Sequence, residues 1–362
     1  MPIKLSIDQI NYLNIWMMIV AAIAACIKPF ETFLFAYAFL GPLHYLTEIS
    51  WLHDRQYFSK GRYDYLFLLA AGIVITLNHF KMIPNIPENA ATPITFIAFI
   101  AALIFVLVKN AAARVGLIVL AAISSILLMN ASAFESIFGI FLPTLIHVFI
   151  FTGLFILMGA LQGRNLSGLL SLIVFVIISL GIFYYRPSSA TYHVSDYVKN
   201  SYGYLKDDGS WTNGLVALNY RIMTAFNLHD FGNPAASVSR FVSGVNDFIY
   251  HRPLALSVMS FIAFAYLYHY LNWFSKTSVI RWHTVPRCRL VAVAILWAVM
   301  LVIYSLDYTI GLKALYFLSI THVLLEFPLN NLTFINVGKE IGAILRSRNS
   351  PSELVACEVP RN

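Results

Sequence analysis

Ten stretches of the chain are almost entirely apolar, and each is long enough to cross a lipid bilayer as a helix. A helix rises about 1.5 Å per residue, so about 20 residues cover the hydrocarbon core of a bilayer, which is about 30 Å thick. Backbone groups inside lipid must pair within their own segment, which favours helices. The pattern predicts membrane helices over residues 11–27, 30–50, 64–80, 92–109, 114–131, 136–161, 167–185, 254–274, 288–306 and 311–331.

The composition supports this interpretation. The 362-residue chain is 59% hydrophobic and only 11% charged, whereas soluble domains carry about 25% charged residues. We therefore expect an all-α fold, a polytopic integral membrane bundle of about ten transmembrane helices. The predicted order is seven helices in residues 1–185, an extracytoplasmic loop over 186–253, three helices in 254–335 and a cytoplasmic tail over 336–362.

The distribution of Lys and Arg predicts the orientation, because cytoplasmic loops of membrane proteins are enriched in these residues. With the N-terminus inside, the inner segments hold 15 of the 24 basic residues and the short outer loops hold three, Lys28, Lys81 and Lys313. The other six lie in the long loop, where charge has little influence on orientation. We expect both termini in the cytoplasm and the protein in a bacterial inner (plasma) membrane.

The long loop itself contains two amphipathic segments. One follows Asn233 and Pro234, a typical helix start, and repeats apolar residues on one helical face up to Ile249. The other is the sequence TNGLVALNYRIMTAF. Two interpretations stand: helices that lie at the membrane interface, or a lid over a cavity.

Four of the ten histidines fall inside predicted membrane helices, namely His44, His147, His269 and His322. Their helices all run in the same direction under the predicted topology. Counted from the start of each helix, the four lie within about 6 Å of one depth. This placement allows histidines from four helices to converge.

Two of these histidines have a glutamate one helical turn later: Glu48 follows His44, and Glu326 follows His322. Residues four apart share a helix face, and buried ionisable groups in a membrane usually face a bundle interior. A metal held by the histidines explains both features, with Glu48 and Glu326 as candidate catalytic residues that bind the metal or orient its ligands. Hydrogen bonds that only stabilise packing, or a proton relay, are the alternatives.

Non-haem Fe(II) is the metal that this ligand set favours, since an open position could bind O2, although Zn, Mn and Cu also bind imidazole. The sequence has no HExxH motif of a zinc hydrolase and no clustered histidine boxes of membrane desaturases. Haem b held by two histidines is the rival cofactor. The glutamates have no evident role in that case.

Short segments resemble the Brp/Blh-type membrane β-carotene 15,15′-dioxygenases. Gly41-Pro42-Leu43-His44 with Glu48 is similar to the Gly-Leu-Pro-His…Asp segment of that family, and YLYHYLNWF and THVLLEF lie where the family has later histidine segments. The resemblance implies an all-helical membrane enzyme whose histidines hold a non-haem iron and which cleaves a carotenoid with O2. The family has a His-x-x-x-His pair, whereas here Trp273 stands four residues after His269.

These features lead to one main hypothesis and three alternatives. The main hypothesis is a membrane-embedded metal oxygenase whose partners are membrane lipid, O2 and a hydrophobic substrate such as a carotenoid. The alternatives are a proton-coupled transporter, a haem-binding membrane protein and a structural protein whose polar cluster fixes helix packing. No stacking motif or basic run points to nucleic acid.

Overall fold

The computed structural model describes residues 5–84, 86–185, 192–232 and 237–349, and nearly all of its regular structure is helical. Within those ranges the only β-type pairing is an isolated antiparallel bridge between Leu205 and Trp211. The predicted all-α class is confirmed.

Seven helices in the described ranges are long and apolar enough to cross a membrane, which indicates an integral membrane protein. They are α1 (Ile7–Ile27), α6 (Ala111–Leu128), the continuous helical segment Ser132–Gly163, α9 (Leu166–Tyr184), α13 (Pro253–Ser275), α15 (Arg287–Leu306) and α16 (Tyr308–Asn349). Two further apolar helices are shorter, α4 (Asp64–His79) and α5 (Ala91–Leu107).

The remaining predicted span, 30–50, is helical in three successive pieces. These are α2 (Pro29–Phe35), the π-helical turn η1 (Ala36–Leu40) and α3 (Gly41–His53). Pro42 has no N–H to donate and its ring crowds the carbonyl four residues before it, so the turn that precedes it widens. The same effect recurs in Ser132–Gly163. There α7 (Ser132–Phe134) leads into η4 (Glu135–Phe151), a π-helix that contains Pro143, and then into α8 (Thr152–Gly163).

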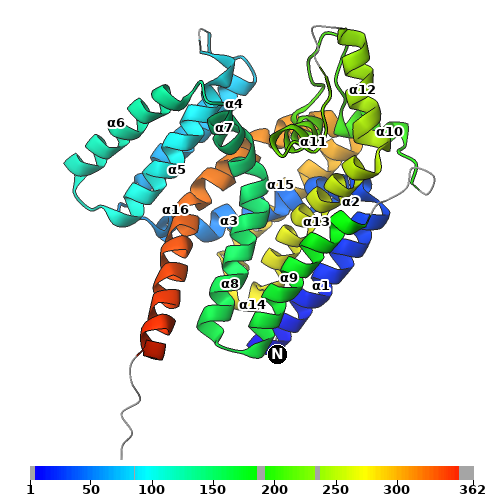
Figure 1. Ribbon diagram of the computed structural model, residues 1–362. Coiled ribbons are helices and arrows are strands. Elements are labelled where there is room, and N and C mark those ends of the chain that lie inside the picture. Colours follow the sequence, from blue (N-terminus) through cyan, green and yellow to red (C-terminus); the bar gives the residue numbers. More distant parts are fainter. Residues whose placement is uncertain (1–4, 85, 186–191, 233–236, 350–362) are drawn as a thin grey trace, which may run out of the picture.

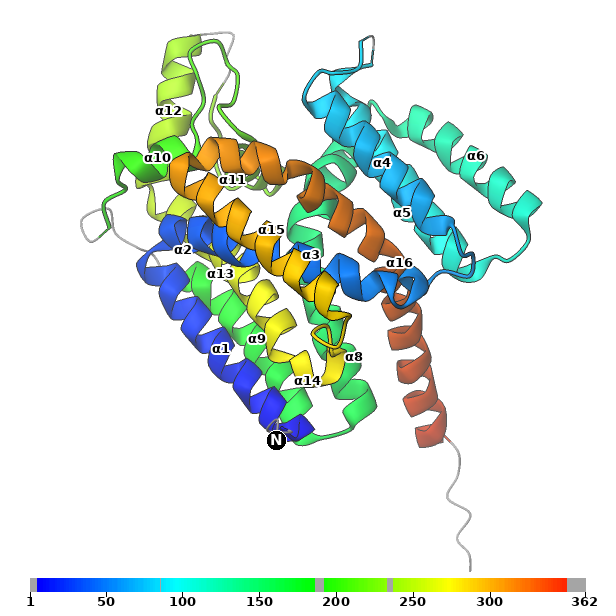
Figure 2. The ribbon, with the colours of Figure 1, turned by 180° about the vertical axis from the view of Figure 1, so that it is seen from behind.

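The helices form two groups joined by α16. In both views α1, α9 and α13 lie side by side, with α8 next to α9 (Figures 1 and 2). Helix α13 is the centre of this group, and its side chains are buried almost throughout. The second group is α4, α5 and α6, in which α5 packs between the other two. Helix α16 packs against α3, α4, α5 and α8, so it links the two groups.

Helix α16 is longer than the sequence predicts. It runs over 42 residues, so its described part extends well beyond the predicted end at 331 and into the predicted tail. The tail residues 350–362 lie outside the described ranges. Figure 2 shows the first part of α16 beside α15 and its last part turning away. Pro328 lies within the helix, and an internal proline removes one backbone hydrogen bond and permits such a bend.

The long segment after α9 folds into three helices, α10 (Asp196–Tyr202), α11 (Gly214–Ala225) and α12 (Val238–His251), which we call the outer cap. Ser237 caps α12, and the predicted cap residues Asn233 and Pro234 lie outside the described ranges. The outer cap packs on the starts of α2 and α13, at the opposite end of the bundle from the N-terminus (Figure 1). The hydroxyl of Tyr202 on α10 donates to Asn219 Oδ1 on α11 at 2.6 Å, which ties two of its helices together.

Candidate metal centre

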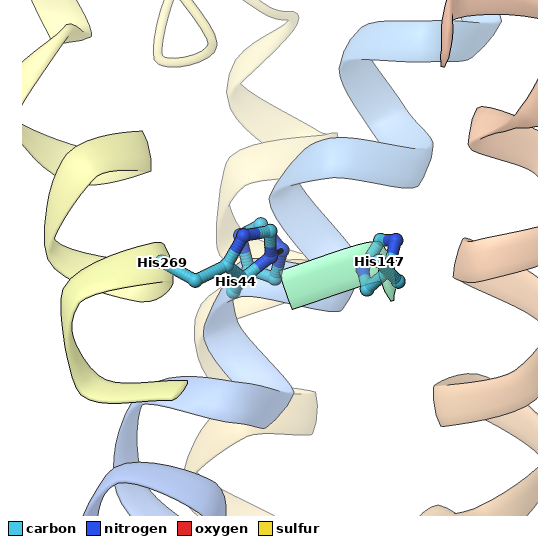
Figure 3. A group of neighbouring side chains, drawn as sticks. All are labelled: His44, His147 and His269. Atoms are coloured by element: carbon cyan, nitrogen blue, oxygen red, sulfur yellow. Dashed lines mark hydrogen bonds between the residues drawn. The ribbon is translucent and has the colours of Figure 1, made fainter. Parts of the chain in front are cut away.

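The four intramembrane histidines come from four separate helical elements and meet in the interior. His44 is on α3, His147 on η4, His269 on α13 and His322 on α16. Figure 3 shows His269 reaching from α13 toward His44, with His147 nearby on η4. Their exposed fractions are 1%, 2%, 7% and 2% in the same order, so all four are shielded from solvent. The predicted convergence is thus found.

The same ring nitrogen of each histidine faces the centre of the cluster. The Nε2 atoms of His44 and His269 are 3.1 Å apart, and those of His147 and His322 are 3.2 Å apart. Imidazole nitrogens bind divalent metals at about 2.1 Å, so neighbouring ligands are about 3.0 Å apart at right angles and about 3.4 Å apart in a tetrahedron. The observed separations lie in this interval.

The four rings form one closed group. Centroid distances around the cluster are 4.7 Å from His44 to His269, 5.0 Å from His269 to His147, 5.0 Å from His147 to His322 and 5.7 Å from His322 to His44. Four near-equal edges describe a ring of imidazoles. Candidate ligand atoms of His44, His147 and His269 all lie within 4.8 Å of one another, which one ion could bridge.

Glu48 lies on the inner side of this ring. Its Oε2 is 3.0 Å from Nε2 of His44, the nitrogen that faces the centre. Ligand atoms of Glu48, His44 and His322 fall within 4.8 Å of one another, so they form a second group that could hold a metal. Glu48 is therefore placed to bind the same ion directly.

Glu326 contacts a different histidine. Its Oε2 is 3.0 Å from Nδ1 of His147, and its carboxyl group also lies against that of Glu48. Sequence spacing pairs Glu326 with His322 on its own helix, but the close contact is made across helices. A carboxylate on the outward nitrogen fixes the ring orientation and raises the basicity of a metal-binding histidine.

Thr152 supports His269, and no pattern in the sequence indicates this role. Its Oγ1 is 2.8 Å from Nδ1 of His269. Thr152 begins α8, directly after the π-helix η4 that carries His147. A threonine hydroxyl often bonds its own helix backbone in a membrane segment, so only the folded chain reveals this partner.

Aromatic residues pack around the cluster and fix its rings. Tyr45 stacks on His322 with centroids 3.9 Å apart, and its hydroxyl is 2.7 Å from that of Tyr270. Trp273 packs edge-on against His44 and donates to Thr47 Oγ1 at 3.0 Å. Trp273 thus has a packing role at the position where the resembled family has a second histidine.

Several buried polar atoms near the cluster have no hydrogen-bond partner within the described ranges. They include Nδ1 of His44 and His322, Oε2 of Glu48 and Glu326, Thr321 Oγ1 and Asn272 Oδ1. Burying a polar group without a partner costs free energy, so such groups in one place indicate room for a bound ion or water. The sequence places Thr321 and Asn272 beside the histidines, and their burial agrees with that placement.

The charge of the cluster also fits a cation. Two carboxylates, Glu48 and Glu326, lie among four imidazoles, and no described Lys or Arg forms an ion pair with either. Burying ionised carboxylates without a counter-charge is strongly unfavourable. A divalent ion would supply that counter-charge, and the donors present are of the kinds that Fe, Zn, Mn and Cu accept.

A cavity of about 760 Å³ adjoins the cluster. His147 and His322 line its inner end, and residues of α11 and the loop before it line its outer end. This volume is within the range of small-molecule sites, about 300–1,000 Å³. Helix α11 therefore forms part of the cavity wall.

Comparisons of the chain with family models, curated proteins and solved structures find no match.

Proposed function

We propose that the protein is a membrane-embedded non-haem iron oxygenase that acts on a lipophilic substrate. The observation that carries this proposal is the convergence of four buried Nε2 atoms, at metal-ligand separations, beside a cavity large enough for a substrate. Iron held there would supply activation of O2. The chain itself positions the ligands, excludes bulk water and holds the substrate next to them.

The second donor group favours iron. Ligand atoms of His44, Glu48 and His322 lie within 4.8 Å of one another, which is a set of two histidines and one carboxylate. This donor set with open positions is characteristic of non-haem Fe(II) oxygenases, and an open position can take O2.

The packing disfavours haem. Two axial histidines must stand on opposite faces of a macrocycle, with open space in the plane between them. The four rings instead form a closed group with centroid separations of 4.7 to 5.7 Å. Tyr45 stacked on His322 and Trp273 against His44 fill the surrounding space.

Within this function the two glutamates have different roles. Glu48 is a candidate direct ligand, and Glu326, 3.0 Å from Nδ1 of His147, is a candidate to orient that ring. Tyr45 and Tyr270 line both the cluster and the cavity, so they shape the space for substrate at the metal. The resemblance of residues 41–48 to β-carotene dioxygenases makes a carotenoid one substrate to test.

We also propose that both termini are cytoplasmic, in a bacterial inner membrane crossed about ten times. The bias of Lys and Arg supports this orientation. So does the arrangement in Figure 1, where the N-terminus and the last turns of α16 lie at one end of the molecule and the outer cap at the other. Fusion of a reporter that fluoresces only in the cytoplasm to the C-terminus tests it, and a silent, stable fusion would contradict it.

Metal analysis together with O2 consumption tests the function. Protein purified in detergent should contain stoichiometric iron, lack haem absorbance and consume O2 when supplied with an accepted lipophilic substrate. A well-folded protein that binds no metal after reconstitution with Fe(II) would refute the oxygenase. Proton-coupled solute uptake by such metal-free protein in vesicles would favour the transporter, in which the His/Glu cluster relays protons.

A further inference from the structure

The cavity extends from the candidate metal centre toward the outer cap beside α16. Lys313, Tyr316, Ser319 and His322 all line it, three residues apart from one to the next. Each step of three residues turns by about 60° around the helix axis, so the cavity follows the surface of the helix as it turns. Nine residues separate Lys313 from His322, which corresponds to about 13 Å along the helix. A ligand that touches both ends must therefore be elongated.

The wall of the cavity changes character along this length. Next to the histidines it is formed by tyrosines, among them Tyr45, Tyr266 and Tyr270. Aliphatic residues such as Ile75 and Val148 also line the cavity. At the outer end the wall carries two permanent cations, Arg221 of α11 and Lys313, and no Asp or Glu is among its described lining residues.

Both cations are available to a ligand. Arg221 Nη2 is 3.3 Å from Glu135 Oε1, but the two side chains are 40% and 47% exposed, so the pair is weak. Arginine has five N–H donors, and one such contact leaves the others free. Lys313 is exposed and forms no ion pair within the described ranges.

Lys313 is also unusual for its side of the membrane. Only three basic residues lie in the short outer loops, and one of them, Lys28, is 3.6 Å from Glu31. Outer loops are normally poor in lysine, so orientation does not account for a lysine at a cavity mouth. Two cations at the rim of a hollow with low-dielectric walls attract an anion.

We infer that the substrate is an elongated amphiphile with an anionic head group, a carboxylate or a phosphate. Its head group lies between Arg221 and Lys313, and its apolar chain extends past the tyrosines to the histidines. This inference rests on the proposed function in one respect: it takes the ligand of the cavity to be the substrate of the metal centre. A neutral hydrocarbon such as a carotene offers nothing to the two cations.

The test measures binding of labelled dodecanoate, dodecyl phosphate and the neutral dodecanamide to full-length protein in phosphatidylcholine nanodiscs, with empty nanodiscs as background. Wild-type protein should bind at least one anionic probe about tenfold more tightly than the amide, since two charge-assisted contacts are formed. The better anion identifies the head group. The Arg221→Gln/Lys313→Gln variant should reduce this preference to about twofold or less.

Arg240→Gln/Lys206→Gln is the matched control, because both residues are exposed in the outer cap and neither lines the cavity. Equal affinity of wild-type protein for all three probes would overturn the inference, as would an equal loss in the control variant. Metal analysis of the same samples separates the two proposals. An anion preference in metal-free protein would support the inference and contradict the oxygenase, whereas bound iron without a preference would contradict the inference alone.

Discussion

Helices α3 and α16 carry the same short pattern, a histidine followed four residues later by a glutamate, but they use it differently. On α3, Glu48 Oε2 lies 3.0 Å from Nε2 of His44 on its own helix. On α16, Glu326 Oε2 lies 3.0 Å from Nδ1 of His147 on η4. The two glutamates therefore meet different ring nitrogens, one within its own helix and the other across helices.

This difference shows what helical spacing does and does not determine. Spacing of four places both side chains on one face. Which nitrogen of which histidine the carboxylate meets depends on the neighbouring helix. Helix α16 packs against η4, so a histidine of another element takes the contact that spacing alone assigns to His322.

The largest effect is expected from removing a ring nitrogen that faces the centre, on either helix. His44→Ala and His322→Ala should each reduce bound metal to background, because each removes a direct ligand and opens the ring of imidazoles. Plasma mass spectrometry of detergent-purified protein measures this. His53→Ala is the matched control, since His53 ends α3 and is exposed outside the cluster. Full metal retention in either folded cluster variant would contradict the proposed centre.

The next effect separates the two glutamates by role. Glu48→Gln removes the charge and one candidate oxygen ligand from the inner face, so affinity for Fe(II) should fall about 100-fold or more. The residual metal should also have an altered ligand environment. Titration with Fe(II) and the visible spectrum of the Co(II)-substituted protein measure the two quantities. An unchanged spectrum would place Glu48 outside the coordination sphere.

Glu326→Gln should have a smaller effect of a different kind. The amide leaves all direct ligands in place but holds Nδ1 of His147 less strongly, so affinity should fall about 10- to 100-fold. The Co(II) spectrum should keep its wild-type form. If Glu326→Gln changed the spectrum and Glu48→Gln did not, the assigned roles of the two glutamates would be reversed.

Much of this architecture could be predicted from the sequence, because long apolar runs determine membrane helices independently of their neighbours. All ten predicted spans are helical, and most begin or end within a few residues of the predicted positions. Hydropathy does not tell which helix is central, however. Helix α6 is more apolar than α13, with mean hydropathy 2.2 against 1.6. However, only 11% of the most apolar 18 residues of α6 are buried, against 89% of those of α13. The polar residues His269 and Asn272 were the better guide to the interior.

The candidate site could be predicted only as a set of residues. Intramembrane histidines and glutamates are costly in lipid, so their presence alone indicated the four histidines, Glu48 and Glu326. The contacts between them depend on features without a periodic signal. Glu326 meets His147 of η4 and not His322 of its own helix, and Thr152 reaches His269 from a separate helix.

Thr152 allows the smallest test of the same distinction, because it supports a histidine as Glu326 does but without a charge. Thr152→Val keeps the shape of the side chain and removes the hydroxyl that lies 2.8 Å from Nδ1 of His269. Affinity for Fe(II) should fall by about tenfold or less, since a neutral partner stabilises the ring orientation more weakly than a carboxylate.

Thr333→Val is the matched control, because the Thr333 hydroxyl donates only to the Leu329 carbonyl of its own helix. Competition with a chelator of known affinity resolves a change of this size. A loss in Thr152→Val that equals or exceeds that in Glu326→Gln would show that geometry, and not charge, dominates the support of these ligands.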